Sequence, residues 1–286
     1  MVSGFFYFLA AATAPAKWKL FGIIRHHHCS YFTAMNVYEE NISREVSAWK
    51  RRMQARPSIF NRLSKRVQVK INSLLPEKLH AAMTTAIKQM TRAVCFGVGF
   101  TTPEPFYGLP LYEIEARADK KIKNYARTAA AEGAVTGAAG ILLGLADFPI
   151  WLTLKMKMLF ELAALYGYDV RNYKERVYLL HIFELTFSSQ ANRQKVFKII
   201  NDWEHYAESL PDDIHLFDWR NFQQEYRDYI DLAKLLQLVP GIGAPIGAVV
   251  NLRLTNKLGK MAKNAYRMRH NPGVTILEKR VMGYES

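Results

Sequence analysis

The chain has 286 residues, of which half are apolar and 22% are charged, so it can bury a sizeable core and wholesale disorder is not expected. Its formal net charge of +14 indicates an acidic partner: anionic lipid, nucleic acid or an acidic protein. Two cysteines, Cys29 and Cys95, are too few for a disulfide scaffold and form no Cys-x-x-Cys pair, which favours a reducing compartment.

The first 34 residues lack the patterning of the remainder. Phe5–Ala14 are apolar like the centre of a signal peptide, but no Lys or Arg precedes Lys17. Two interpretations stay open: a signal-like segment, or an artefact of gene prediction with Met35 as the true start. We predict three regions: a disordered or wrongly assigned extension (1–34), a helical domain (36–269) and a C-terminal tail (270–286).

Three helices are predicted next, over residues 41–55, 59–75 and 77–96. The second is amphipathic with a basic face, so it can lie in a headgroup layer or pack on a core. Residues 44–92 hold twelve Lys and Arg against two acids. Because each cation near an anionic bilayer contributes about 1 kcal/mol, lipid contacts are predicted here. They are Lys50, Arg51, Arg52, Arg56, Arg62, Lys65 and Arg66.

A helix beginning near Tyr112 runs into a stretch whose glycines are spaced by four, three and four residues, which places them on one helix face. Each mid-helix glycine costs about 1 kcal/mol relative to alanine, so the stripe predicts close packing by another helix. Asp147 and Pro149 then begin a second helix. A buried or membrane-dipping hairpin fits better than a spanning segment. Its residues are Gly133, Gly137, Gly140, Gly144, Asp147 and Pro149.

The last third of the chain separates its charges. Residues 201–231 hold nine acids among aromatic residues, which suits a helix pair or a protein contact and would repel nucleic acid. A Gly/Pro turn then precedes a helix in which residues 251–269 hold six cations and no acid. Re-entry at a membrane interface and a hairpin inside a soluble domain both remain open. The hairpin residues are Pro240, Gly241, Gly243 and Gly247, and the predicted lipid contacts are Lys257, Lys260 and Lys263.

Four short motifs occur in order: Leu75–Lys78, Ala146–Pro149, Tyr166–Asp169 and Val239–Gly243. With the Gly/Ala-rich helix before the second motif, this order resembles the EcsC protein family over residues 36–269. The family is named for a protein encoded beside an ABC transporter. The resemblance therefore implies a helical, membrane-connected protein and carries over no catalytic residue. The last motif also resembles hairpins of membrane-associated domains attached to some GTPases, but the chain has no P-loop.

A search for catalytic patterns finds neither His-Glu-x-x-His nor Gly-x-Ser-x-Gly. His181 and Glu184 share a helix face, but a metal site would need a second such pair, so Glu184 is expected to hydrogen-bond His181. Asp147, a carboxylate among apolar residues, supports the alternative function: an enzyme with a pocket near Asp147 that acts on a lipid or other apolar substrate. No catalytic residue, metal or cofactor is predicted.

The sequence therefore predicts an all-α, multi-helix bundle with two Gly/Pro-containing helical hairpins. The predicted function is that of a non-enzymatic membrane-associated protein, accessory to transport or secretion, which binds an anionic lipid surface through basic helices. We expect it at the cytoplasmic face of the membrane as a peripheral protein, with a membrane protein complex as a second partner. Nucleic acid ranks last, because no recognised nucleic-acid motif is present.

Overall fold

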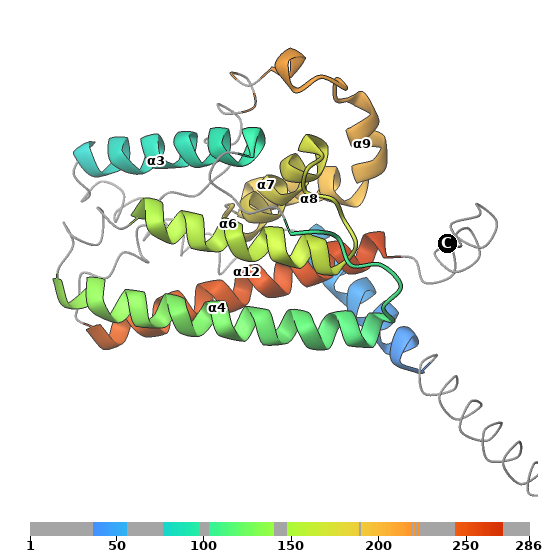
Figure 1. Cartoon of the computed structure of the whole chain (residues 1–286), viewed down its shortest axis with the longest axis horizontal. Coiled ribbons are helices and arrows are strands. Elements are labelled where there is room, and N and C mark those ends of the chain that lie inside the picture. Colours follow the sequence, from blue (N-terminus) through green and yellow to red (C-terminus); the bar gives the residue numbers. More distant parts are fainter. Residues whose placement is uncertain are drawn as a thin grey trace, which may run out of the picture. The chain divides into compact units, whose positions relative to one another are not determined.

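A computed structural model shows the elements of the chain (Figure 1) and describes residues 37–55, 77–97, 103–139, 148–188, 190–218, 220, 222 and 244–270. The chain divides into two units, Met1–Glu45 and Val46–Ser286. The described part of the first unit is the start of a helix over residues 37–54, here called the leading helix. Its residues 46–54 belong to the second unit, which holds every element discussed below.

The described residues are predominantly helical, which confirms the predicted all-α fold class. Two predicted helices, 77–96 and the basic helix that follows the last Gly/Pro turn, match observed helices closely, while the predicted helix 59–75 lies outside the described residues. The labelled elements are α3 (Glu77–Phe96), α4 (Leu111–Ala139), α6 (Phe148–Leu165), α7 (Tyr173–Phe187), α8 (Gln190–Asn201), α9 (Trp203–Ser209), a 3-10 turn η1 (Ile214–Leu216) and α12 (Ala244–Arg269).

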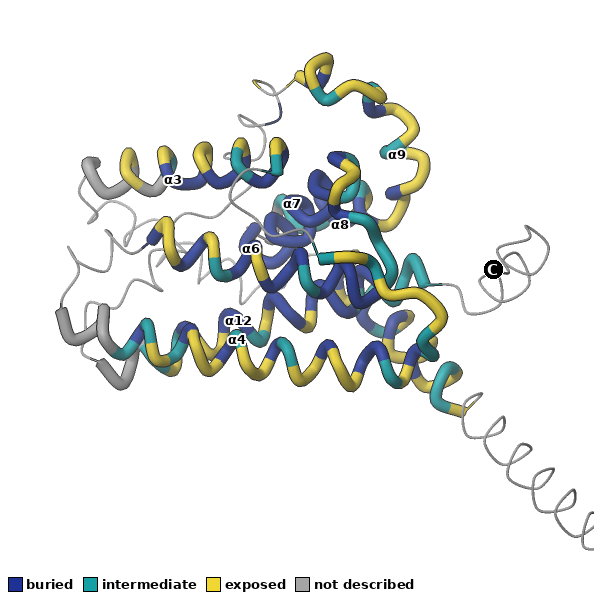
Figure 2. Tube along the Cα trace, viewed as in Figure 1, coloured by how far each residue is buried: buried dark blue, intermediate teal, exposed yellow. Residues whose placement is uncertain are grey.

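Two helices, α6 and α7, form the centre of the second unit and are largely buried (Figure 2). Their apolar residues occur on every side of the helix, which is the pattern of a helix surrounded by others. The Asn172 side chain caps α7 by accepting a hydrogen bond from the Lys174 backbone N–H. Arg176 of α7 donates to the Cys95 carbonyl at the end of α3 at 2.9 Å, and Tyr178 donates to Ala265 of α12 at 3.0 Å.

The two longest labelled helices, α4 and α12, lie side by side and antiparallel (Figure 1). Their register follows from three contacts: Arg267 pairs with Glu115, Lys263 pairs with Asp119, and Gly259 faces Ile122. A step forward of four and then three residues along α4 thus matches two backward steps of four residues along α12, as expected for antiparallel helices in contact. A Cβ at Gly259 would lie 2.6 Å from Ile122 Cγ1, so this glycine permits the close approach of the two helices.

We expect Gly259→Val to lower the free energy of unfolding by about 1–3 kcal/mol, because the added side chain must displace the stiff, β-branched Ile122. Urea unfolding measures this loss. The matched control is Ile122→Ala, alone and combined with Gly259→Val. The double variant should lose less stability than the sum of the two single losses, because the smaller residue makes room for valine. Additive losses would contradict the packing contact.

Candidate functional site

Within the second unit, an open groove with a volume of about 520 Å³ lies between residues 46–54 of the leading helix and α12. The leading helix is held beside α8, because Trp49 packs edge-on against Phe197 with ring centroids 5.4 Å apart. Gln194 of α8 also donates a hydrogen bond of 2.7 Å to the Gln54 carbonyl. The leading helix contributes Trp49, Arg52 and Met53 to the lining, and α12 contributes Arg253, Asn256, Lys257, Lys260, Met261 and Asn264.

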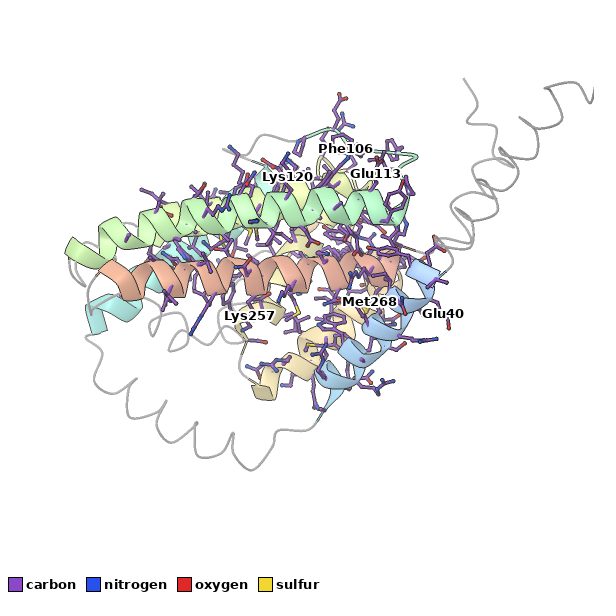
Figure 3. The ribbon with its side chains drawn as sticks, turned by 90° about the horizontal axis from the view of Figure 1, so that it is seen from below. Glu40, Phe106, Glu113, Lys120, Lys257 and Met268 are labelled. Atoms are coloured by element: carbon purple, nitrogen blue, oxygen red, sulfur yellow. The ribbon has the colours of Figure 1, made fainter. Side chains whose placement is uncertain are left out.

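Helical spacing explains why these residues meet. Positions 49, 52 and 53 are three and four residues apart, so they lie on one face of the leading helix. Positions 253, 257, 260 and 264 form an equivalent stripe on α12. Two predicted lipid-binding segments about 200 positions apart therefore form a single site. In Figure 3, Lys257 extends from α12 on the side away from α4.

The groove combines cations with an apolar floor. Arg52, Arg253, Lys257 and Lys260 line it, and no acid is among the described lining residues. The floor residues Trp49, Met53 and Met261 are buried. Like charges three or four residues apart on a helix repel each other by about 0.2–0.5 kcal/mol per pair, so this arrangement works against folding. The groove, with its cations and apolar residues, is chemically suited to bind an anion that carries an apolar part.

The groove cations differ in how they are held. Lys257 Nζ donates to the Thr186 carbonyl at 2.7 Å and lies 5.8 Å from the centre of the Phe187 ring. The exposed side chains of Arg52, Arg253 and Lys260 form no ion pair within the described part of the chain. These three cations therefore remain available to a bound anion.

The structure corrects the prediction for Lys263, which does not face an open surface. Its side chain is buried, and Nζ lies 2.7 Å from Asp119 and 3.5 Å from Glu115 on α4. Arg267 forms a bidentate ion pair with the same Glu115 carboxylate. The reason is the antiparallel register, which brings the acids of α4 to this part of α12. Lys263 therefore joins α12 to α4 and has no free charge for a lipid.

Arg269 also joins α12 to other helices by pairing with their acids. Its guanidinium donates to Glu175 at 2.7 and 2.8 Å and to Glu204 at 2.9 Å. It also lies 4.0 Å from the centre of the Tyr168 ring. Of the six cations of residues 251–269, Lys263, Arg267 and Arg269 pair with acids of other helices, and Arg253, Lys257 and Lys260 line the groove, where Lys257 also bonds to α7.

Lys260 and Lys263 test the distinction between cations that line the groove and cations that pair with acids of other helices. Lys263→Gln should lower the free energy of unfolding by about 1–3 kcal/mol, because it leaves the buried Glu115 of α4 with less compensation. Lys260→Gln should change it by less than about 0.5 kcal/mol, because its side chain makes no ion pair with a described residue. Urea unfolding of both variants gives the comparison, and equal losses would contradict the assignment.

The other predicted contact and hairpin residues are only partly described. Arg51 is exposed and Lys50 is half-buried on the leading helix. Gly133 is buried in α4, and Pro149 is exposed in the first turn of α6. Gly137 and Gly247 lie within α4 and α12. The remaining predicted residues lie outside the described ranges: Arg56, Arg62, Lys65, Arg66, Gly140, Gly144, Asp147, Pro240, Gly241 and Gly243.

Both hairpins therefore stay predictions, as does the alternative of an enzyme pocket near Asp147. Among the described helices, none has the length and apolar character needed to cross a membrane.

His181 and Glu184 form the predicted hydrogen bond, at 2.9 Å between Nδ1 and Oε2. Both side chains are buried, and the rings of Trp203, Tyr206 and Phe222 surround the imidazole. Within the described ranges, no group of three His, Cys, Asp or Glu residues is placed to hold a metal ion. The His181 ring therefore packs Trp203 and Tyr206 of α9, and Phe222, against the buried helix α7.

Lys155 is the polar residue that sequence reasoning missed. It lies in the apolar helix α6 and is fully buried, and its ammonium donates no hydrogen bond to a described residue. It lies 4.7 Å from the centre of the Trp151 ring, whose N–H donates to Asn251 at 2.7 Å. Burial lowers the pKa of Lys155 from 10.5 to about 7, and the nearby Glu132 carboxylate partly opposes this shift.

We expect Lys155→Met to stabilise the protein at pH 6, where the wild-type lysine is charged in both the folded and unfolded states and the full cost of burying it applies. The shift in pKa corresponds to a cost on the order of 5 kcal/mol. The folded lysine loses its proton near pH 7 and the unfolded one near pH 10.5, so wild-type stability should rise between these values.

Urea unfolding from pH 6 to pH 10 measures the difference between Lys155→Met and the wild type, which should shrink as pH rises. The exposed neighbour in α6, Lys157→Met, serves as the control and should change stability little. A variant that is less stable than wild type at pH 6 would show that the buried charge is favourably solvated.

The second unit is helical and carries a cationic, partly apolar groove. The family model described as the EcsC protein family matches residues 40–270, and the chain belongs to this family. It is 43% identical to Protein EcsC of Bacillus subtilis (strain 168) over 229 residues, which are 80% of this chain and 94% of that protein.

A second relative in the same organism is more distant. The chain is 28% identical to the uncharacterised protein YdbA of Bacillus subtilis (strain 168) over 170 residues, which cover 59% of this chain and 62% of YdbA. The comparison with solved structures finds no match. Family membership thus confirms the resemblance seen in the sequence motifs and adds no reaction, ligand or partner.

Proposed function

We propose that this chain is a non-enzymatic, peripheral membrane protein that binds anionic lipid surfaces through the groove between the leading helix and α12. A location at the cytoplasmic face of the membrane and a role accessory to transport or secretion, beside a membrane protein complex, belong to the same proposal. The observation that carries it is the groove itself, where Arg52, Arg253 and Lys260 meet without an ion pair to a described residue.

The distribution of ion pairs supports this proposal. Where α12 faces α4, Lys263 and Arg267 are paired with acids, so the fold does supply counter-charges where cations serve packing. The groove has none among its described lining residues. Arg51 adds exposed positive charge on the leading helix beside it. Near an anionic bilayer each such cation contributes about 1 kcal/mol, so several together hold a protein on the surface.

The charge-reversal variant Arg253→Glu/Lys260→Glu should bind vesicles of phosphatidylglycerol and phosphatidylcholine at least about tenfold more weakly than wild type, measured by flotation at low salt. The matched control is Lys120→Glu/Lys123→Glu, which makes the same change in net charge on exposed positions of α4 (Figure 3 labels Lys120). This control should lose much less binding, because α4 does not line the groove.

Salt dependence separates surface adhesion from other modes of binding. Wild-type binding should weaken strongly near 1 M salt, where the screening length is only about 3 Å. Pure phosphatidylcholine vesicles should bind little at any salt concentration. If wild-type protein floats with neither type of vesicle at low salt, or if the two double variants lose binding equally, the proposed function is wrong.

A further inference from the structure

Resting on the proposed function, we infer that the groove is a discrete site for one anionic phospholipid: its phosphate binds among Arg52, Arg253 and Lys260, and its apolar part lies on Trp49, Met53 and Met261. This goes beyond adhesion to a charged surface. It states that one lipid molecule binds to each chain, with both halves of the ligand recognised.

The shape of the groove distinguishes binding of a single lipid molecule from adhesion to a charged surface. A flat basic surface is sufficient to hold a protein on a bilayer, whereas here cations from two helices converge around a hollow of about 520 Å³. That volume lies within the range of about 300–1,000 Å³ typical of sites for small molecules. Trp49 is fixed by its edge-on contact with Phe197, so the floor of the groove is built before a ligand arrives.

The chemistry of the lining indicates an amphiphile. Two guanidinium groups, from Arg52 and Arg253, offer paired N–H donors that match phosphate oxygens. The Lys257 ammonium is held in place by its bond to the Thr186 carbonyl, which orients it at the edge of the site. Free inorganic phosphate would use the cations and leave the apolar floor unused.

An exposed apolar side chain continues the same face of α12. Val249 lies four residues before Arg253 and is 47% exposed, so it stands next to the cationic stripe. Ordinary surfaces show scattered residues of this kind, but here the position follows the line from the groove along the helix. It extends the apolar surface available to the lipid beyond Trp49, Met53 and Met261.

The test uses the full chain and dihexanoyl phosphatidylglycerol kept below the concentration at which it forms micelles, with binding measured by titration calorimetry. We expect saturable binding of one lipid per chain. Asn256→Trp fills the hollow without removing a cation and should weaken this binding at least about tenfold. Asn124→Trp, the same substitution at an exposed position of α4, is the matched control and should leave it unchanged.

Further measurements distinguish a discrete lipid site from surface adhesion and from simple phosphate binding. Equal affinity for inorganic phosphate, or unchanged lipid binding by Asn256→Trp with its fold verified by thermal unfolding, would overturn the inference. If the short-chain lipid does not bind while anionic vesicles do, the discrete site is wrong and the proposed surface binding stands. If vesicles fail while the short-chain lipid binds with one-to-one stoichiometry, the site is supported and the surface proposal is wrong. Arg253→Gln/Lys260→Gln should abolish binding of the soluble lipid.

Discussion

The close antiparallel contact between α4 and α12 is the constraint on which the site depends. Gly259 allows the helices to approach until its backbone meets the Ile122 side chain. At that distance, the acids Glu115 and Asp119 reach Arg267 and Lys263. The register therefore decides which cations of α12 are neutralised. Those on the opposite stripe remain charged and meet the leading helix across the groove.

Much of the fold was predictable because local patterns dominate it. Runs of helix-forming residues and nearby prolines are signals that act over a few residues, and they predicted the start of α3 at Glu77 and that of α12 near Ala244. The motif order also identified the family correctly. The glycine stripe predicted that helices would pack closely on small residues. That prediction is untested, because most of the stripe lies outside the described residues; the close contact that the structure does describe is made by Gly259, an isolated glycine of α12.

The site was predictable only in its chemistry. The sequence indicated basic residues on two segments, but their meeting depends on tertiary packing over a separation of about 200 positions. Lys263 was wrongly grouped with Lys260 because both are cations of one helix, and their different roles depend on the acids opposite. Lys155 and Lys157 likewise interrupt one apolar helix, yet the first is buried and the second exposed. A helix that is apolar on every side gives no pattern by which to choose between them.

The energetics of the two kinds of cation argue for different uses. Lys263 and Arg267 are partly or fully removed from water and have acids within ion-pair distance, so their charges contribute to the contact between two helices. The groove cations repel their neighbours along α12 and receive no such compensation from the described lining. Bringing a negative charge into the groove would relieve this repulsion. Binding and folding are therefore linked: a ligand that occupies the groove stabilises the folded chain by its own binding free energy. An anion with an apolar part would also contact Trp49, Met53 and Met261 where they line the groove, so one molecule would interact with both the cations and the apolar residues.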